Sequence, residues 1–143
     1  MTDMTAATDF EIALRAPTWE RMRQVEALVR AQADGSRSPL EGALAALIAA
    51  GGKRLRPRIA VLSGGMLEAD PAKLVTLAAA IELLHTAALV HDDLVDGSSL
   101  RRGVATLNAR WSAAASVLVG DFAFTKATEL ALTSKYKSEF LAN

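Results

Sequence analysis

The sequence has no cysteine, few aromatic residues and no excess of charge of either sign. Without cysteine, neither a disulfide framework nor thiolate chemistry is available. A formal net charge of zero argues against nucleic acid as the main partner. No apolar run approaches the roughly 20 residues of a membrane span, and the N-terminus lacks the charged-then-apolar pattern of a signal peptide. We therefore expect a soluble, cytoplasmic protein without a transmembrane segment.

Proline is also scarce. Only four prolines interrupt a chain of 143 residues, of which 51% are hydrophobic. This composition and the helical spacing of the apolar residues predict an all-α fold, a helical bundle. The length corresponds to about one domain. We expect that domain to cover residues 1–143, with 1–16 poorly patterned and loosely ordered.

Caps and prolines divide the chain into five expected helices. Pro17 is expected to open the first helix, in which Trp19 begins a stripe of core residues. Ser38 followed by Pro39 predicts a second helix that ends at Gly51. The remaining helices are expected from Pro57 to near Gly64, from the Asp70–Pro71 cap to the acidic stretch below, and from about Leu107 toward Ser134, with Trp111 and Leu118 in its core stripe.

The central stretch of the chain, residues 85–103, carries three aspartates at the end of an apolar helical segment. At about 3.6 residues per turn, Asp92 and Asp96 lie one above the other on a single helix face. Their charges repel each other and oppose the helix macrodipole. A hard divalent cation would relieve this repulsion, and Mg²⁺ is commonly held by carboxylates together with water and substrate phosphate oxygens.

Two arginines, Arg101 and Arg102, follow the aspartates after a short polar break. Their forked guanidinium groups match the geometry of phosphate oxygens. Carboxylates, metal and arginines together indicate a diphosphate site. The alternative is a solvated acidic helix end beside a basic loop.

A basic stretch lies upstream, with the sequence Gly51-Gly52-Lys53-Arg54-Leu55-Arg56-Pro57-Arg58. The two glycines predict a helix C-terminus, and the proline predicts the first residue of the next helix. Four cations thus crowd a helix N-terminus, where they are disfavoured until an anion binds. The two clusters of opposite sign predict a polyanionic, metal-bridged ligand between them. The alternative is a surface turn for nucleic acid or lipid headgroups.

These motifs carry a family resemblance. The pair Gly-Gly-Lys-Arg-Leu-Arg-Pro and Asp-Asp-x-x-Asp followed by Leu-Arg-Arg-Gly resembles the trans-isoprenyl diphosphate synthases, or polyprenyl synthetases, from about Leu40 to Thr133. An isolated Asp-Asp-x-x-Asp also fits a terpene cyclase, but a cyclase does not need Lys53 and Arg56 for a second diphosphate. The resemblance implies the first part of the isoprenoid synthase fold. It also implies a prenyltransferase that condenses isopentenyl diphosphate with an allylic prenyl diphosphate.

The resemblance further implies roles for single residues. Asp92 and Asp96 would hold Mg²⁺ at the allylic diphosphate, with Asp93 as an outer partner, and Arg101 would bind that diphosphate. The residues implied for isopentenyl diphosphate are Gly52, Lys53, Arg56, His85 and Arg102. The implied catalytic set is Asp92, Asp93, Asp96, Lys53, Arg101 and Arg102.

Four further residues bear on the site: Ala87, Ala88, His91 and Asp121. In the resembled family, the positions just before the first aspartate form the pocket floor, so Ala87 and Ala88 imply an open chain-length pocket and a longer product. The alternative is that these alanines only allow close helix packing. His91 is expected to orient or pack rather than to bind a ligand. Asp121 is either a capped or paired buried acid or an outer group of the site, and the sequence leaves both open.

The chain departs from the family pattern in one important respect. Members of the family are longer and carry a second aspartate-rich motif on a later helix, whereas the acids after Asp96 are scattered here as Asp121, Glu129 and Glu139. One wall of a two-walled site cannot fix reacting groups on both sides. We expect the N-terminal half of a polyprenyl diphosphate synthase, with exposed apolar surface that favours a homo- or hetero-oligomer. The alternative is a non-catalytic regulatory subunit or an isoprenoid-binding helical module.

Overall fold

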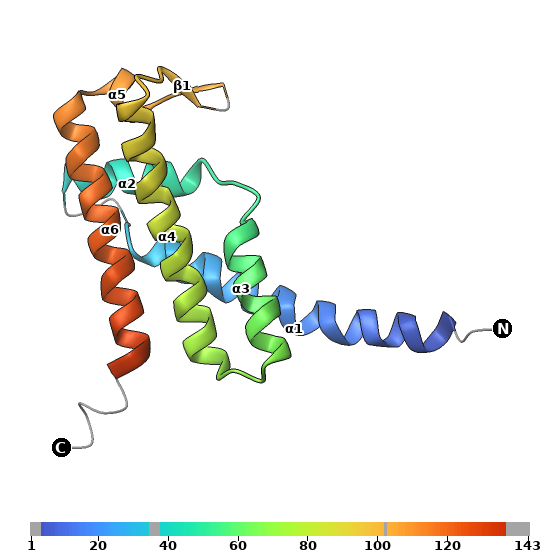
Figure 1. Cartoon of the computed structure of the whole chain (residues 1–143). Helices are drawn as coiled ribbons and strands as arrows, with labels where there is room; N and C mark the ends of the chain where they lie inside the picture. Colours follow the sequence, from blue (N-terminus) through green and yellow to red (C-terminus); the bar gives the residue numbers. More distant parts are fainter. Residues whose placement is uncertain (1–3, 35–37, 102, 137–143) are drawn as a thin grey trace.

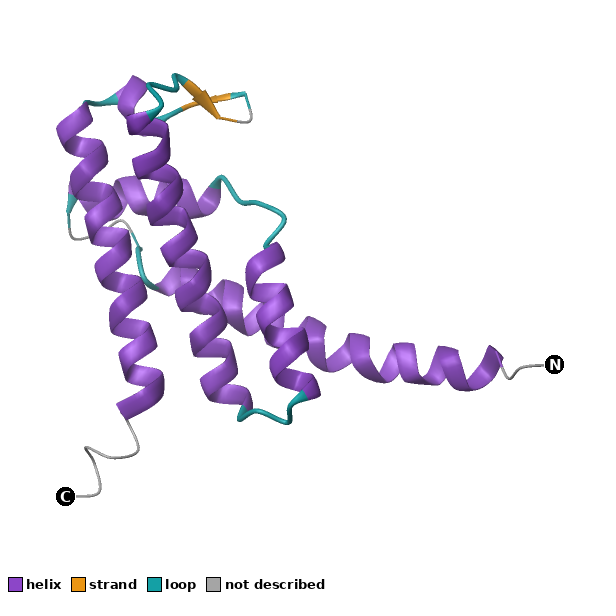
Figure 2. Ribbon diagram, in the orientation of Figure 1, coloured by secondary structure: helices purple, strands orange, loops and turns teal. Residues whose placement is uncertain are grey.

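The computed structural model describes residues 4–34, 38–101 and 103–136, with side chains between residues 17 and 133 of those ranges. This part of the chain is helical apart from its connections and one short hairpin (Figure 2). The elements are α1 (Met4–Ala31), α2 (Pro39–Ala49), α3 (Leu55–Met66), α4 (Pro71–Val95), β1 (Leu100–Arg101), β2 (Val104–Ala105), α5 (Leu107–Arg110) and α6 (Ala113–Tyr136). The predicted all-α fold is confirmed.

The central element is α4, which packs along α6 and also contacts α1 and α3 (Figure 1). It begins as predicted, since the Asp70 carboxylate accepts a hydrogen bond of 2.8 Å from the Lys73 backbone N–H and Pro71 holds the first position. Where α4 meets α6, a Cβ at Gly120 would overlap the His91 ring. The largest fully buried aliphatic side chains are Leu44, Leu83, Val25, Val29, Val61 and Val119.

The start of α3 and the end of α2 position the basic stretch. Ser38 caps α2 by accepting a hydrogen bond of 3.1 Å from the Glu41 N–H, and Gly51 (φ 71°) follows its end. Pro57 is the third residue of α3 rather than the first. A proline is tolerated throughout the first turn because the N–H groups there have no partner within the helix.

The expectation that Pro17 opens the first helix is wrong, because α1 begins at Met4 and continues through Pro17. The expected loose order of residues 1–16 stays a prediction. A proline removes one helical hydrogen bond at a cost of about 3 kcal/mol. Strong helix formers, mainly Ala, Glu, Leu and Arg, flank this proline on both sides and favour one continuous helix. In Figure 1 the N-terminal part of α1 extends beyond the other helices.

The expected fifth helix is also interrupted. The chain leaves the helical conformation at Trp111 (φ −121°, ψ −96°), and Ser112 Oγ then accepts a hydrogen bond of 3.1 Å from the Ala115 N–H. This serine therefore caps α6, as serine commonly does at a helix start. Three apolar residues expected in the core are instead exposed by about half or more, on surfaces that no other described element covers: Trp19 by 67%, Trp111 by 49% and Leu118 by 54%.

One further expectation needs correction. By length and composition, α4 contains a window apolar enough to cross a membrane, contrary to our estimate from the sequence. Half of that window is buried within the bundle. A helix that is apolar nearly all round is typical of the core of a helical protein.

Candidate functional site

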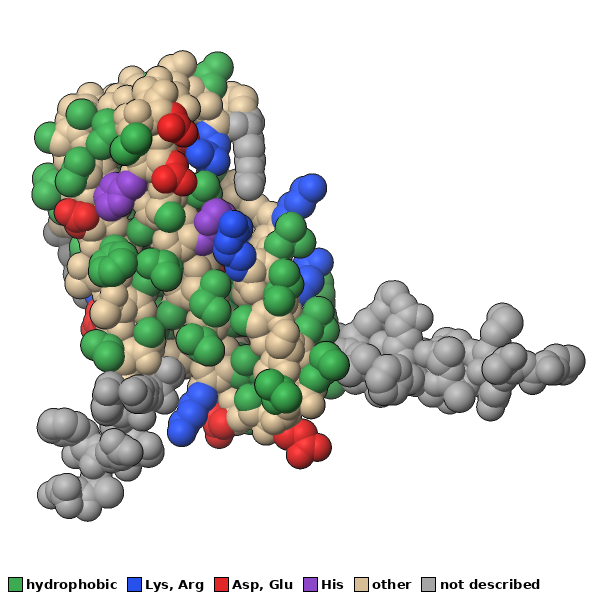
Figure 3. Space-filling view, in the orientation of Figure 1, with side chains coloured by type: hydrophobic (Ala, Val, Ile, Leu, Met, Phe, Trp, Pro, Cys, Tyr) green, Lys and Arg blue, Asp and Glu red, His purple; other side chains and the backbone are tan. Residues whose placement is uncertain are grey.

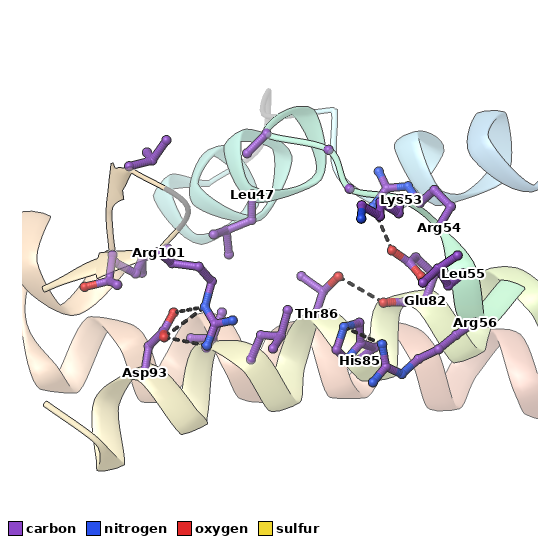
Figure 4. A pocket seen from close by; sticks show the side chains of 18 of the residues that line it. Leu47, Lys53, Arg54, Leu55, Arg56, Glu82, His85, Thr86, Asp93 and Arg101 are labelled. Carbon is purple, nitrogen blue, oxygen red and sulfur yellow. Dashed lines mark hydrogen bonds and ion pairs between the residues drawn. The ribbon is translucent and has the colours of Figure 1, made fainter. Parts of the chain in front are cut away.

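The basic and acidic stretches meet at one pocket of about 290 Å³ (Figure 4). Its walls come from the end of α2, the α2–α3 loop, the start of α3, one face of α4 and the β1–β2 hairpin. The predicted residues Gly52, Lys53, Arg56, His85 and Arg101 all line it. Segments that are nearly 50 residues apart in sequence are thus brought to one cavity.

At one end of the pocket, Arg56 and His85 contact each other directly. Arg56 Nη1 lies 2.9 Å from His85 Nε2, so α3 and α4 are joined across the pocket by this pair. Lys53 is exposed in the loop that precedes α3. Among the described ion pairs, none involves Lys53 or Arg56. These two cations therefore present positive charge that no described carboxylate neutralises.

Arg54, between these two cations, has the opposite environment. Its side chain is 13% exposed and makes four hydrogen bonds. Nε and Nη2 donate to the Glu26 carboxylate at 2.9 and 3.3 Å, Nη1 donates to Glu82 Oε1 at 2.8 Å, and Nη2 donates to the Ile48 carbonyl at 3.1 Å. The side chain of one residue at the start of α3 thus binds α1, α2 and α4.

The electrostatics of this cluster favour its charged state. The hydrogen bond with Arg54 is the main cause that lowers the pKa of Glu26, although burial acts in the opposite direction. The hydrogen bond with Glu26, and then that with Glu82, raises the pKa of Arg54 against the effect of burial. Buried ion pairs are costly unless their hydrogen bonds are satisfied, and here both Arg54 and Glu82 are satisfied.

At the other end of the pocket, Arg101 of β1 forms an ion pair with Asp93 of α4 (Figure 4). Arg101 Nε donates to both oxygens of Asp93 at 2.9 and 2.8 Å, and Nη2 lies 2.7 Å from Oδ1. The hydrogen bond to Asp93 is the main cause that raises the pKa of Arg101. The Asp93 side chain is 12% exposed and that of Arg101 is 38% exposed. Asp93 therefore faces the arginine and not the solvent.

Asp92 and Asp96 remain on the solvent side of α4. The Asp96 N–H donates to the Asp92 carbonyl at 2.8 Å, so the two aspartates lie one turn apart as predicted. Both are exposed, and both add to the charge that raises the pKa of Arg101. In the part of the chain that the structure describes, no group of three or more acidic or histidine side chains gathers around one point. Two carboxylates nevertheless fit Mg²⁺, which takes its other oxygens from water and phosphate.

The remaining predicted residues have clear positions. His91 Nε2 lies 3.4 Å from the Val117 carbonyl and 3.6 Å from Asp121 Oδ1, which agrees with an orienting or packing role. Asp121 is 65% exposed, so it is paired but not a buried acid. Ala87 is buried in the core cluster and Ala88 is exposed, and neither lines the pocket. Their role in chain length stays a prediction. Arg102 lies outside the described residues.

Comparison with known proteins assigns the family. The polyprenyl synthetase family model matches residues 37–142. Octaprenyl diphosphate synthase of Escherichia coli is 52% identical over 84 residues, which are 59% of this chain and 26% of that protein. The chain therefore belongs to the polyprenyl synthetase family, as the two motifs indicated.

Solved structures agree with this assignment. A decaprenyl diphosphate synthase from Rhodobacter capsulatus has a TM-score of 0.77 and 40% identity, over 92% of this chain and 41% of that one. A polyprenyl synthase from Caulobacter crescentus, complexed with calcium and isoprenyl diphosphate, has a TM-score of 0.77 and 45% identity, over 90% of this chain and 40% of that one. The fold is therefore the first part of the isoprenoid synthase fold, and the chain spans less than half the length of these proteins.

The sequence analysis missed the residues that hold the site together. Arg54 was one of four cations in the basic motif, and neither Glu26 nor Glu82 was assigned to the site. A weak signal was present, because Glu82 interrupts an otherwise apolar stretch of α4. A charged residue in such a stretch needs a partner. The sequence does not say from which helix that partner comes.

Proposed function

We propose that this chain forms the first wall of a prenyltransferase site, which condenses isopentenyl diphosphate with an allylic prenyl diphosphate. The observation that carries the proposal is the single pocket that joins Lys53, Arg56, His85 and Arg101. Two of these, Lys53 and Arg56, are cations without a carboxylate partner among the described side chains, so both are available to a diphosphate anion. Membership of the polyprenyl synthetase family supports the same reaction.

In this proposal the two diphosphates occupy opposite ends of the pocket. Lys53, Arg56 and His85 bind the diphosphate of isopentenyl diphosphate at the α3 end, with Gly52 shaping the loop and Arg102 as a further predicted ligand. Arg101 binds the allylic diphosphate at the hairpin end, where Asp93 holds its guanidinium in place. The allylic C–O bond breaks, the isopentenyl double bond forms the new C–C bond, and a proton is lost.

A divalent cation completes the site. Asp92 and Asp96 would hold Mg²⁺. The bound ion would neutralise negative charge on the leaving diphosphate. Both carboxylates are exposed and lie next to the Arg101 end of the pocket. Asp93 is already bound to Arg101 and thus supports the arginine instead of the metal.

The second wall of the site must come from residues beyond those described. The solved relatives carry more than half of their length outside the matched region. The face left open here carries many exposed hydrophobic side chains (Figure 3). Among them, Leu77 and Leu84 of α4 are exposed by 45% and 46% and Phe124 of α6 by 53%. An apolar surface of this kind is suited to cover by further helices or by another subunit.

The test is to measure binding and turnover separately with this purified chain. We expect it to bind isopentenyl diphosphate in the presence of Mg²⁺, measured by calorimetry, and Lys53→Ala to weaken binding by about tenfold or more, since a charge-assisted hydrogen bond is lost. Arg58→Ala is the matched control, because Arg58 lies in the same basic stretch but does not line the pocket. With labelled isopentenyl diphosphate and farnesyl diphosphate, we expect no elongated product from this chain alone.

Three results would change the proposal. No binding, or equal loss in the lysine variant and the Arg58 control, would contradict the assignment of the basic end. Product that disappears in Asp92→Ala would show that this chain, alone or as an oligomer of itself, suffices for turnover, and would contradict the need for further helices. Binding without turnover after a second wall is supplied would favour the non-catalytic binding module.

A further inference from the structure

We infer that Arg54 is a positioning residue, whose side chain fixes the loop that carries Lys53 and Arg56 without binding the ligand itself. This inference rests on the proposed function, because it explains how the basic end of the pocket is held ready for a diphosphate. Lys53 and Arg56 flank Arg54 at the start of α3 and both line the pocket. The three cations belong to one sequence motif, but Lys53 and Arg56 bind the ligand whereas Arg54 positions them.

The contacts of Arg54 leave it little capacity for a ligand. Both of its terminal nitrogens and Nε are already used, by two carboxylates and a backbone carbonyl. Its charge faces two negative charges, those of Glu26 and Glu82. A diphosphate that approached Arg54 would therefore compete with two carboxylates and be repelled by them. Lys53 and Arg56 meet no such obstacle in the described pocket.

The same contacts set the position of the loop. The Arg54 guanidinium ties the start of α3 to α1 through Glu26, to α2 through Ile48 and to α4 through Glu82. The backbone of Arg54 lies in the left-handed region (φ 50°, ψ 40°), a conformation that is costly for a residue with a Cβ. The side-chain contacts of Arg54 help to offset that cost.

This left-handed residue directs the chain on either side of it. It ends the loop that contains Lys53 and begins the helical turn that contains Arg56. Arg56 in turn meets His85 of α4 at 2.9 Å. Loss of the Arg54 contacts is therefore expected to move Lys53 and Arg56 away from the pocket and to break the contact with His85.

The first experiment measures coupling in ligand binding. Lys53→Ala is expected to weaken the binding of isopentenyl diphosphate with Mg²⁺ by about tenfold, and Arg54→Ala by at least as much, because it displaces Lys53 and Arg56 together. Since Lys53 is already displaced in Arg54→Ala, the double variant is expected to bind about as weakly as Arg54→Ala alone. A loss in the double variant equal to the product of the two single losses would mean that Arg54 does not act through Lys53 and would overturn the inference.

The second experiment needs no ligand. The sequence holds only two histidines, His85 and His91, so their ring protons are readily assigned by NMR. Arg54→Ala is expected to move the His85 resonances and to leave those of His91, which contacts α6, in place. Arg54→Lys keeps the charge but offers a single nitrogen, so an intermediate shift is expected. Unchanged His85 resonances in a folded Arg54→Ala variant would also overturn the inference.

The two experiments separate the possible failures. If the wild-type chain binds no isopentenyl diphosphate, the proposed function fails, whereas the His85 resonances still decide whether Arg54 positions the loop. If Arg54→Ala does not fold, Arg54→Lys and Glu82→Gln serve in both measurements. A folded Arg54→Lys or Glu82→Gln variant with wild-type affinity and wild-type His85 resonances would contradict the inference.

Discussion

The pocket face and the open face of α4 belong to one helix but are built in opposite ways. On the pocket face, Glu82 and Asp93 are buried, and each forms an ion pair with an arginine from a different segment of the chain. On the open face, Leu84 and Val95 are exposed by 46% and 84%, and Asp92 faces solvent among them. The chain therefore completes the polar interactions of one wall and leaves the adjacent apolar surface uncovered within its described residues.

The spacing of the two acids explains the pocket face. Glu82 and Asp93 are eleven residues apart, which is about three helical turns and places them on the same side of α4. The two ends of the pocket differ in how tightly they are held. Arg54 is 13% exposed with two carboxylates, whereas Arg101 is 38% exposed with one. This difference agrees with the two proposed roles, a fixed support at Arg54 and a ligand-binding arginine, open to solvent, at Arg101.

The largest expected effect concerns the stability of the pocket face. Glu82→Ala leaves the buried Arg54 with one carboxylate instead of two, and we expect it to lower the free energy of unfolding by about 2–3 kcal/mol, because a charge-assisted hydrogen bond is lost. Leu84→Ala, on the open face of the same helix, is expected to cost less than about 1 kcal/mol because nearly half of its side chain is already exposed. Urea denaturation measures both. Equal losses would remove the distinction between the two faces.

The sequence predicted much of the fold and the composition of the site, but not its internal support. Caps such as Ser38 and Asp70 depend on neighbours three residues away, so local pattern is enough to find them. The pairing of Arg54 with Glu26 and Glu82 spans 28 residues in each direction. Such contacts depend on how helices pack, which a local pattern does not contain.

The errors in the core have a related cause. Helical spacing places Trp19 and Leu118 among other apolar residues of their helices, but it does not say which face another helix covers. Both are exposed in the described structure. In α6 the buried face carries Val119, Ala123 and Ala127 instead. Periodicity identifies an apolar helix face, and only the tertiary packing shows whether another helix covers it.

The second expected effect separates the two neighbouring aspartates. Asp92 is exposed and is proposed to bind the metal, whereas Asp93 holds Arg101. We expect Asp92→Asn to abolish the enhancement by Mg²⁺ of allylic diphosphate binding, a loss of about tenfold or more. Asp93→Asn is expected to weaken binding with and without Mg²⁺ by similar factors. Titration of farnesyl diphosphate at zero and saturating Mg²⁺ checks this, and the reverse pattern would exchange the two roles.

A smaller effect is expected from acid. Because the folded-state pKa of Glu26 lies below its usual value of 4.5, its stabilising contribution is fully present above about pH 4.5 and is lost as the pH falls through the lowered pKa. We expect the free energy of unfolding to fall in this window by about 1 kcal/mol from this group. Glu26→Gln should remove that part of the pH dependence. Urea denaturation from about pH 6 to about pH 3 compares the two proteins.

Glu20→Gln is the control for acid, since Glu20 lies on the same helix and pairs with Arg23 at an exposed site. Its variant is expected to follow the wild-type pH dependence, because exposed ion pairs contribute little. If the free energy of unfolding of Glu26→Gln fell with pH as steeply as that of the wild type, other acidic residues would account for the loss of stability.

The smallest expected change in stability tests the open face directly. Leu84→Gln and Phe124→Gln replace apolar side chains that are exposed by 46% and 53%, so each is expected to alter the free energy of unfolding by less than about 0.5 kcal/mol. The same variants should clearly reduce the binding of a hydrophobic dye and the tendency to associate, because both depend on contiguous exposed apolar surface. A compact wild-type monomer that binds no dye would show that this surface is not available, and the face would then not need a second wall to cover it.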